Sequence, residues 1–192
     1  MLLSLRHKFI FIHIYKAAGT SVTHALRPFT REPWWRRRAV PRLPDHITAA
    51  ELREIIGDLF DRCFKFTFVR NPWDWQVSLY HYMQQTRKHP QHRLVSAMTF
   101  DDYIRWRVTE DKHLQKEFVT DAGGKTIVDF VGRFENLEDD FAVACAKIGI
   151  SATLPHTNRS RHADYRTYYD DVTRELVASH FREDIEMFGY TF

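Results

Sequence analysis

Short apolar runs alternate along the chain with longer segments in which apolar residues recur at helical spacing. The runs over 9–14 and 63–69 are rich in Phe, Ile and Val, a pattern typical of strands buried on both faces. The first run closes the opening stretch 1–14, which we read as the first strand, and a run over 127–134 predicts another. Strands that alternate with helices favour a small α/β domain with a largely parallel sheet. Helices are predicted over 22–26, from 48 onward, over 72–85, from 99 onward, over 136–148 and over 171–188.

Capping residues support the predicted helix starts. Thr48 and Glu51 form a capping box ahead of an apolar-periodic segment. Asn71 can cap the helix after the second strand, because its side chain can accept from the first backbone amides, and Pro72 suits the first helical turn. No repeat or linker interrupts the pattern, so the chain is predicted to form a single domain over 1–192.

Composition narrows the class of protein. The chain is 44% hydrophobic and 28% charged, as ordinary soluble globular proteins are. No apolar run approaches the ~18 residues of a membrane-spanning helix, and the start lacks the pattern of a signal peptide. Two cysteines, Cys63 and Cys145, lie inside apolar segments, which predicts buried structural thiols in a reducing compartment. We therefore expect a cytoplasmic protein without a transmembrane segment.

Positive charge is unevenly distributed, although the formal net charge is only +3. Six arginines fall within sixteen positions and are joined by two tryptophans. Such a block predicts an anionic partner. It could bind nucleic-acid phosphates or a membrane surface, or it could line a cleft in which tryptophan faces hold sugar rings and arginines hold acidic groups. The block comprises Arg27, Arg31, Trp34, Trp35, Arg36, Arg37, Arg38 and Arg42.

A loop of small residues follows the first strand and precedes a predicted helix. It reads Lys16-Ala17-Ala18-Gly19-Thr20-Ser21. The amides of such a loop and of the first helical turn can hold a phosphate, and the helix dipole adds to them. Gly19 permits close backbone approach, Thr20 and Ser21 supply hydroxyls, and Lys16 supplies charge. A Walker A loop carries its lysine directly before the serine or threonine, whereas here the lysine lies at the front, so the loop is a poor match to that of an ATPase.

Two stretches resemble sulfotransferases that use 3′-phosphoadenosine-5′-phosphosulfate (PAPS), of the carbohydrate, heparan/chondroitin-type and bacterial Golgi-sulfotransferase-like kind. The loop is similar to their 5′-phosphosulfate-binding pattern P-K-[TA]-[AG]-[GS]-[TS]-S, with Tyr15 in place of the usual proline. Residues 66–80 resemble V-R-[ND]-P-[WF]-[DE]-R-x-[VL]-S-x-Y, which holds the 3′-phosphate in that family, with Trp75 in place of an arginine. The resemblance implies that the loop residues bind the phosphosulfate and that Arg70 and Ser78 bind the 3′-phosphate.

Eleven histidines compete for the part of a proton acceptor, the usual role of histidine at neutral pH. We expect His13, inside the first strand, to be buried and hydrogen-bonded. His46 precedes the capped helix in a stretch that resembles [KG]-H-[AST]-T-[AL] of bacterial relatives and of heparan and chondroitin sulfotransferases, where the histidine is the base. The resemblance implies that His46 is the base and that Lys16 stabilises the leaving oxygen.

The late part of the chain also resembles the family. Residues 154–161 are similar to L-P-H-x-N-x-S-x-[RH], and the end of the chain shares the family's F-G-Y, so the resemblance runs from end to end. In relatives this late loop covers the nucleotide. The resemblance therefore implies that Asn158, Ser160 and Arg161 take part in nucleotide binding.

Together the patterns predict a P-loop-like three-layer domain with a small central parallel sheet flanked by helices. We expect a sulfotransferase that moves the sulfuryl group of PAPS to an acceptor hydroxyl by in-line displacement, without a metal, and releases adenosine 3′,5′-bisphosphate. Because His46 lies four residues beyond Arg42, we expect an acidic carbohydrate acceptor, not a nucleic acid. Its binding residues are predicted to be Trp34, Trp35, Arg38 and Arg42.

Two other functions stay open at this point. A P-loop nucleotide kinase or NTPase would need a lysine directly before Ser21 and an aspartate at a strand end to hold Mg²⁺. Thr20 and Arg70 occupy those positions, which disfavours it. A nucleic-acid or membrane-surface binding module would use the arginine block, and it is distinguished by where that block lies relative to His46.

Overall fold

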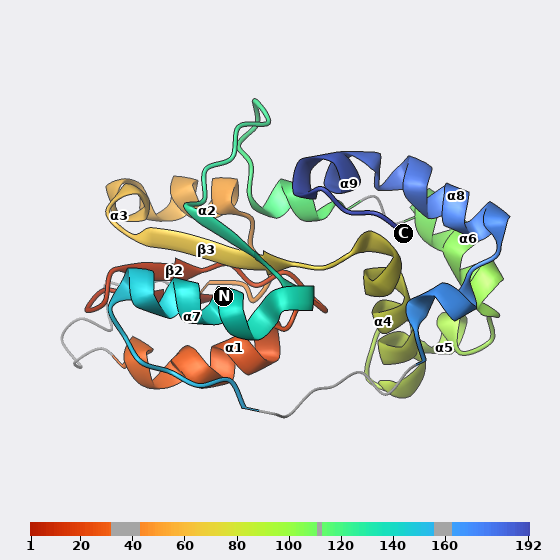
Figure 1. Cartoon of the computed structure of the whole chain (residues 1–192), viewed down its shortest axis with the longest axis horizontal. Helices are drawn as coiled ribbons and strands as arrows, with labels where there is room; N and C mark the ends of the chain where they lie inside the picture. Colours follow the sequence, from red (N-terminus) through yellow and green to blue (C-terminus); the bar gives the residue numbers. More distant parts are fainter. Residues whose placement is uncertain (32–42, 111–112, 156–162) are drawn as a thin grey trace. The chain divides into compact units, whose positions relative to one another are not determined.

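A computed structural model describes residues 1–31, 43–110, 113–155 and 163–192. The chain divides into two units (Figure 1). The first unit is Met1–Val69 with Gln115–Asn158, and the second is Arg70–Leu114 with Arg159–Phe192.

The first unit is built on a four-stranded sheet with the order β1-β2-β3-β4. β1 is antiparallel to β2, whereas β2 is parallel to β3 and β3 is parallel to β4. The register places Phe66 of β3 beside Phe11 of β2 and Phe130 of β4. The predicted largely parallel sheet is therefore confirmed. The strands are β1 (Leu2–Ser4), β2 (Phe9–Phe11), β3 (Phe64–Val69) and β4 (Phe130–Arg133).

The opening stretch forms a hairpin, so the prediction of one strand over 1–14 was wrong. The chain turns over 5–8, and Lys8 adopts a left-handed conformation with φ 51°. The polar residues Arg6, His7 and Lys8 interrupt the apolar pattern at this turn. Because the strand reverses there, its two halves pair with each other as β1 and β2.

Helices cover both faces of this sheet. Figure 1 shows α1 and α7 on one side and α2 and α3 on the other, which confirms the predicted three layers. Phe9, Phe11, Phe66 and Phe68 from the strands form one buried cluster with residues of α1 and α7. The helical elements of this unit are α1 (Gly19–Leu26), η1 (Arg27–Thr30), α2 (Ala49–Ile56), α3 (Asp58–Asp61), η3 (Gln115–Phe118), η4 (Phe134–Asn136) and α7 (Leu137–Ile148).

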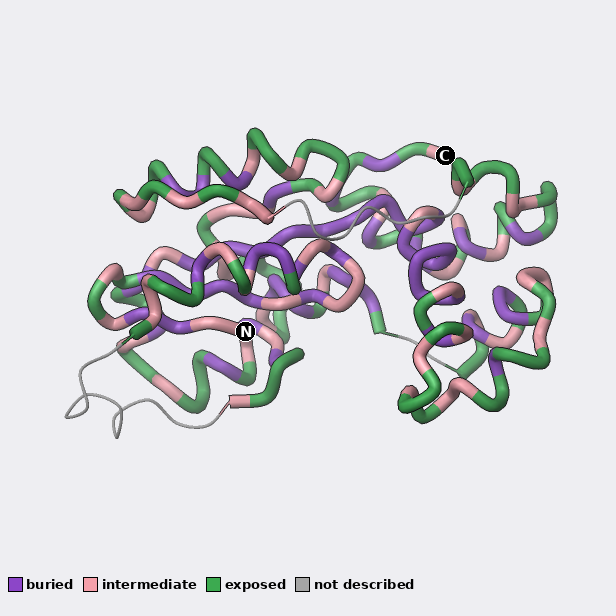
Figure 2. Tube along the Cα trace, turned by 90° about the horizontal axis from the view of Figure 1, so that it is seen from below, coloured by how far each residue is buried: buried purple, intermediate pink, exposed green. Residues whose placement is uncertain are grey.

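Alternation along β3 decides which side chains meet which layer. Phe66 and Phe68 join the cluster with α1 and α7, so Lys65 and Thr67 point the other way. Both polar side chains are buried yet bonded: Thr67 Oγ1 donates to the Ile12 carbonyl (2.7 Å), and Lys65 Nζ pairs with Asp129 (2.9 Å). Figure 2 shows the buried stretches of the trace and the alternation of buried and exposed positions along the helices.

The second unit is helical. Asn71 accepts from the Trp73 amide (3.0 Å) at the start of α4, as predicted. The predicted single helix over 171–188 is two helices, because the chain leaves the helical conformation at Phe181. The Phe181 ring is fully buried and packs edge-on against Trp75, with centroids 5.8 Å apart. The elements are α4 (Pro72–Gln85), α5 (His92–Val95), α6 (Phe100–Glu110), η5 (Tyr165–Tyr168), α8 (Asp171–His180) and α9 (Arg182–Phe188).

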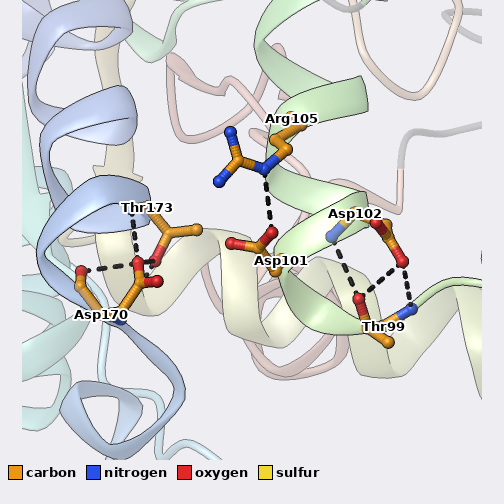
Figure 3. Close-up of polar contacts among 6 residues, drawn as sticks. All are labelled: Thr99, Asp101, Asp102, Arg105, Asp170 and Thr173. Carbon is orange, nitrogen blue, oxygen red and sulfur yellow. Dashed lines mark hydrogen bonds and ion pairs between the residues drawn. The ribbon is translucent and has the colours of Figure 1, made fainter.

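Helices α6 and α8 each begin with a reciprocal cap (Figure 3). Thr99 Oγ1 donates to Asp102 Oδ2 (2.7 Å), and the Asp102 amide donates back to Thr99 Oγ1 (3.2 Å). Asp170 Oδ1 accepts from both the amide (2.7 Å) and the hydroxyl (2.6 Å) of Thr173. Each cap satisfies amides that the helix itself cannot.

A membrane-spanning helix is not found in the part of the chain that the structure describes: none of its helices combines the necessary length with sufficient apolar character.

Candidate active site

The loop after β2 turns the chain with two residues in the left-handed region. Lys16 has φ 61° and Ala18 has φ 62°, a conformation that costs a residue with a Cβ about 1–2 kcal/mol. The first bond of α1 runs from the Val22 amide to the Ala18 carbonyl (3.1 Å), so the amides of 19–21 precede the helical ladder. Left-handed turns followed by a helix N-terminus form an amide concavity of the kind that binds anions.

Gly19 is the point where this loop meets His13. A Cβ placed on Gly19 would coincide with the imidazole ring of His13. Its φ is not among the positive values of the chain, so close approach, and not backbone conformation, requires glycine here. The sequence suggested that Gly19 lets the backbone approach a ligand; the structure adds that it makes room for a side chain.

His46 lies against the same histidine. Its Nδ1 is 2.9 Å from the backbone oxygen of His13, and the centroids of the two rings are 4.7 Å apart. Its neighbours hold it in place, because Ile47 is buried and Thr48 forms the predicted capping box with Glu51. The His46 residue itself is exposed. The exposed imidazole is thus fixed at one nitrogen and reachable at the other.

His13 differs from the buried, hydrogen-bonded strand residue that the sequence suggested. It follows the end of β2 and is only half-buried. Its ring stacks on Phe11, with centroids 6.0 Å apart and an interplanar angle of 20°. Desolvation, followed by the neighbouring His46, lowers the pKa of His13 from 6.5 to about 4. His13 is therefore neutral near pH 7, and its place beside Gly19 was not predictable from its position in an apolar run.

Tyr15, the departure from the family's proline, is a second residue whose placement the sequence did not predict. Its ring is edge-on to the rings of His46 and Phe118, with centroids 5.9 Å and 6.4 Å away. Phe118 is 6% exposed and Tyr15 is half-buried. Tyr15 therefore places an aromatic ring next to His46, and Phe118 packs against Tyr15.

Arg70 comes directly after β3, at the start of the second unit. Its side chain is 3% exposed, and Nε donates to Asp74 Oδ2 at 2.7 Å. This bond fixes the plane of the guanidinium group. Next to it, Asn71 Nδ2 donates to the backbone oxygen of Thr191 (2.8 Å). The start of α4 is thus attached to the end of the chain.

Ser78 lies two turns further along α4 and is 4% exposed. Between it and Arg70, Trp75 is fully buried and packs on Phe181, and the guanidinium carbon of Arg107 lies 5.8 Å from its ring centroid. Trp75 is therefore a core residue of this unit. An arginine at this position would place its charge in the core, where an unpaired charge is costly.

The described residues include only part of the predicted site. The predicted acceptor-binding and late-loop residues lie outside the described residues. Elsewhere, the described ranges contain no cluster of three or more His, Cys, Asp or Glu residues able to hold a metal ion. Both cysteines are free and buried, and burial raises the pKa of each thiol, in agreement with the prediction. The residues outside the described ranges are Trp34, Trp35, Arg38, Arg42, Asn158, Ser160 and Arg161.

Comparisons with known proteins identify the family and the fold. A model of the family described as "Sulfotransferase family" matches residues 1–191. An uncharacterized protein of Archaeoglobus fulgidus is 32% identical over 118 residues, which are 60% of this chain and 93% of that protein. The fold is similar to the crystal structure of mouse sulfotransferase SULT7A1 complexed with PAP, with a TM-score of 0.57 and 14% identity over 95% of this chain and 85% of that one. This likeness confirms the predicted P-loop-like α/β fold.

Proposed function

Because the chain belongs to the sulfotransferase family, we propose that it transfers the sulfuryl group of PAPS to an acceptor hydroxyl, with His46 as the base. The observation that carries the base assignment is the 2.9 Å contact between His46 Nδ1 and the backbone oxygen of His13. A carbonyl oxygen can only accept, so Nδ1 donates and keeps its proton. The lone pair of neutral His46 is then on Nε2, where it can accept a proton from an alcohol.

The loop over 16–21 fits the 5′ end of the donor. Its left-handed turns precede the amides that start α1, and Lys16 adds a positive charge. Arg70 and Ser78 are assigned to the 3′-phosphate, because a guanidinium held by Asp74 offers its donors in a rigid fork. In this proposal 1–192 acts as one sulfotransferase domain. The sequence resemblance adds three nucleotide-binding residues, Asn158, Ser160 and Arg161.

The chain's own residues then have three tasks during transfer. PAPS, when bound, supplies the sulfuryl group, whose bond to the 5′-phosphate oxygen breaks as the bond to the acceptor oxygen forms. His46 Nε2 takes the proton of the acceptor hydroxyl. Lys16 and the amides of 19–21 stabilise the negative charge that develops on the leaving phosphate oxygen. The loop holds the donor for in-line attack, which converts a bimolecular step into an oriented one.

The acceptor is proposed to be an acidic carbohydrate. The six arginines over 27–42 and the tryptophans Trp34 and Trp35 precede His46 closely in the sequence. Tyr15, which packs on Phe118, adds an aromatic ring beside the base. Acceptor KM should therefore rise with salt, since salt screens attraction between charges; a KM that does not change with salt would argue for a neutral acceptor. Two free buried thiols suit a reducing compartment, so we place the enzyme in the cytoplasm.

The first experiment is isothermal titration with adenosine 3′,5′-bisphosphate, AMP and ATP–Mg²⁺ on the wild type and Arg70→Ala. Preference for the bisphosphate that the variant loses is expected. Absence of binding, or tighter binding of ATP–Mg²⁺, would sink the sulfotransferase assignment and favour a nucleotide kinase.

A second experiment tests the base. His46→Ala should bind the bisphosphate as the wild type does, while kcat for sulfuryl transfer falls by about 10²–10⁴, the usual contribution of a general base. Thr48 and Glu51 cap α2 immediately after His46, so Glu51→Gln is a control for damage to that helix start. An His46→Ala variant with wild-type kcat would refute the base assignment.

A further inference from the structure

We propose that His13 is a positioning residue that couples the phosphosulfate loop to the base His46, an inference that rests on the proposed function. His13 contacts both parts of the candidate site in the first unit. Its ring edge lies against Gly19 of the loop, and its backbone oxygen and ring both lie against His46.

The contact with the loop is steric. The atoms of His13 nearest to a Cβ on Gly19 are Cδ2, Nε2 and Cε1, so the Nε2 edge of the ring faces the loop. Real Cβ atoms essentially never approach another atom this closely, so a methyl group at position 19 must displace the ring or the start of α1. Movement of the loop is thereby transmitted to the imidazole of His13.

The contact with the base is made in two ways. The backbone oxygen of His13 fixes Nδ1 of His46, and the two rings meet at 61° with centroids 4.7 Å apart. The backbone contact selects the tautomer, whereas the ring contact restricts how the His46 ring can turn about it. Loss of the His13 ring therefore leaves the tautomer unchanged but loosens the direction of Nε2.

The position of the His13 ring is also restricted by the core of the sheet. It stacks on Phe11, which is buried in the core cluster of the sheet. Burial lowers its pKa most and keeps it neutral; of the charged and titratable groups near it, His46 and the N-terminal amine of Met1 lower the pKa further and Asp45 raises it. A neutral His13 adds no positive charge next to His46, so the base remains able to take up a proton.

The test is a double-mutant cycle of His13→Ala and Gly19→Ala, with kcat and the affinity for adenosine 3′,5′-bisphosphate as readouts. Each single variant should lower kcat by about 10-fold or more, because small misplacements of catalytic groups have large effects. The double variant should be little worse than His13→Ala alone, since the added methyl group no longer meets a ring. The affinity of His13→Ala for the bisphosphate should stay within about 3-fold of the wild-type affinity, as expected for a change in geometry at the base.

Two further variants separate this role from others. His7→Ala removes a histidine that packs on Phe29 at the hairpin turn and should leave kcat unchanged. His13→Asn, neutral and planar, should recover part of kcat with the same pH profile as the wild type.

Three results would overturn the inference while the function stands. The first is additive losses in the cycle. The second is wild-type kcat in His13→Ala. The third is an active His46→Ala beside an inactive His13→Asn, which would make His13 the base; sulfuryl transfer would stand, but the assignment of His46 as the base would fall with the inference. A wild type that does not bind the bisphosphate would instead refute the proposed function.

Discussion

Arg70 Nε donates to Asp74 Oδ2 at 2.7 Å, in a pair whose side chains are only 3% and 14% exposed. A second pair with the same i,i+4 spacing joins Arg105 to Asp101 at 2.8 Å, but its side chains are 52% and 45% exposed (Figure 3). Water screens exposed charges and leaves them little net attraction. Removing one partner of a buried pair, in contrast, leaves a charge in a poorly solvated place. Because the two ion pairs have the same spacing and nearly the same length but differ in exposure, comparing them separates the effect of burial from that of geometry.

We therefore expect Asp74→Ala to lower the free energy of unfolding by about 3 kcal/mol. The matched change Asp101→Ala should lower it by less than about 1 kcal/mol. Urea denaturation of both variants measures the difference, and equal losses would show that the burial of Arg70 has no energetic consequence.

Arg70→Lys tests the recognition of the 3′-phosphate. Lysine keeps the positive charge but loses the planar fork that can bind a phosphate through two donors. Affinity for adenosine 3′,5′-bisphosphate should fall by about 10-fold or more, whereas affinity for AMP, which lacks the 3′-phosphate, should not change. Titration of both nucleotides gives the answer. Parallel losses for the two would assign Arg70 to another part of the nucleotide, and Arg105→Lys serves as the unaffected control.

The ring of Phe192 attaches the end of the chain to α4 and η5. It meets Trp73, Tyr165 and Tyr169 with centroid distances of 5.5, 5.7 and 5.6 Å. Phe192→Ala should therefore lower the free energy of unfolding by about 2 kcal/mol through lost aromatic packing. Thermal unfolding measures it against Met187→Ala, a 38% exposed residue for which a change within about 0.5 kcal/mol is expected. Similar Tm values for the two variants would contradict the attachment.

His13 should make stability depend on pH. Its pKa is 6.5 when unfolded and about 4 when folded, so between these values the unfolded chain binds more protons than the folded protein. The contribution of His13 to the free energy of unfolding is complete above its pKa in the unfolded chain. It is lost as the pH falls toward its pKa in the folded protein. Relative to His13→Asn, the wild type should lose about 2 kcal/mol between pH 7 and 4, allowing for water at the half-buried ring. Chemical denaturation at several pH values tests this, and parallel curves for the two proteins would disprove it.

Asp102 and Asp170 should contribute in the same sense as His13, but at lower pH. Hydrogen bonds from Thr99 to Asp102, and from Thr173 to Asp170, lower the pKa of each carboxyl below its ordinary value of 3.8. A carboxyl with a lowered pKa stabilises the fold above the unfolded pKa, and this stability disappears as pH falls through the folded one. Asp102→Asn and Asp170→Asn should thus be less stable than the wild type at neutral pH and approach it below pH 3.8. If the variants stayed less stable than the wild type in acid, the loss of stability would come from the lost hydrogen bonds alone and not from the lowered pKa of each carboxyl.

Local signals predicted most of the elements well. The capping box of Thr48 and Glu51 and the Asn71 cap formed where the sequence placed them. The break at Phe181 did not follow from periodicity, because it depends on a ring that enters the core beside Trp75. The turn at Lys8 was missed although Arg6, His7 and Lys8 interrupt the apolar pattern, because this interruption does not by itself show that the runs on its two sides pair with each other.

By itself, the sequence determined the features that depend on neighbours within about one helical turn: the caps, the strand over 64–69, and the small-residue loop between a strand and a helix. Such features are set by backbone hydrogen bonds and side chains close along the chain. Only the tertiary structure decided that His13 meets Gly19 and His46, 33 positions further on, and that Trp75 is a core residue. These contacts arise when the packed sheet and helices bring distant segments together, and neither hydrophobic period nor motif spacing carries that information.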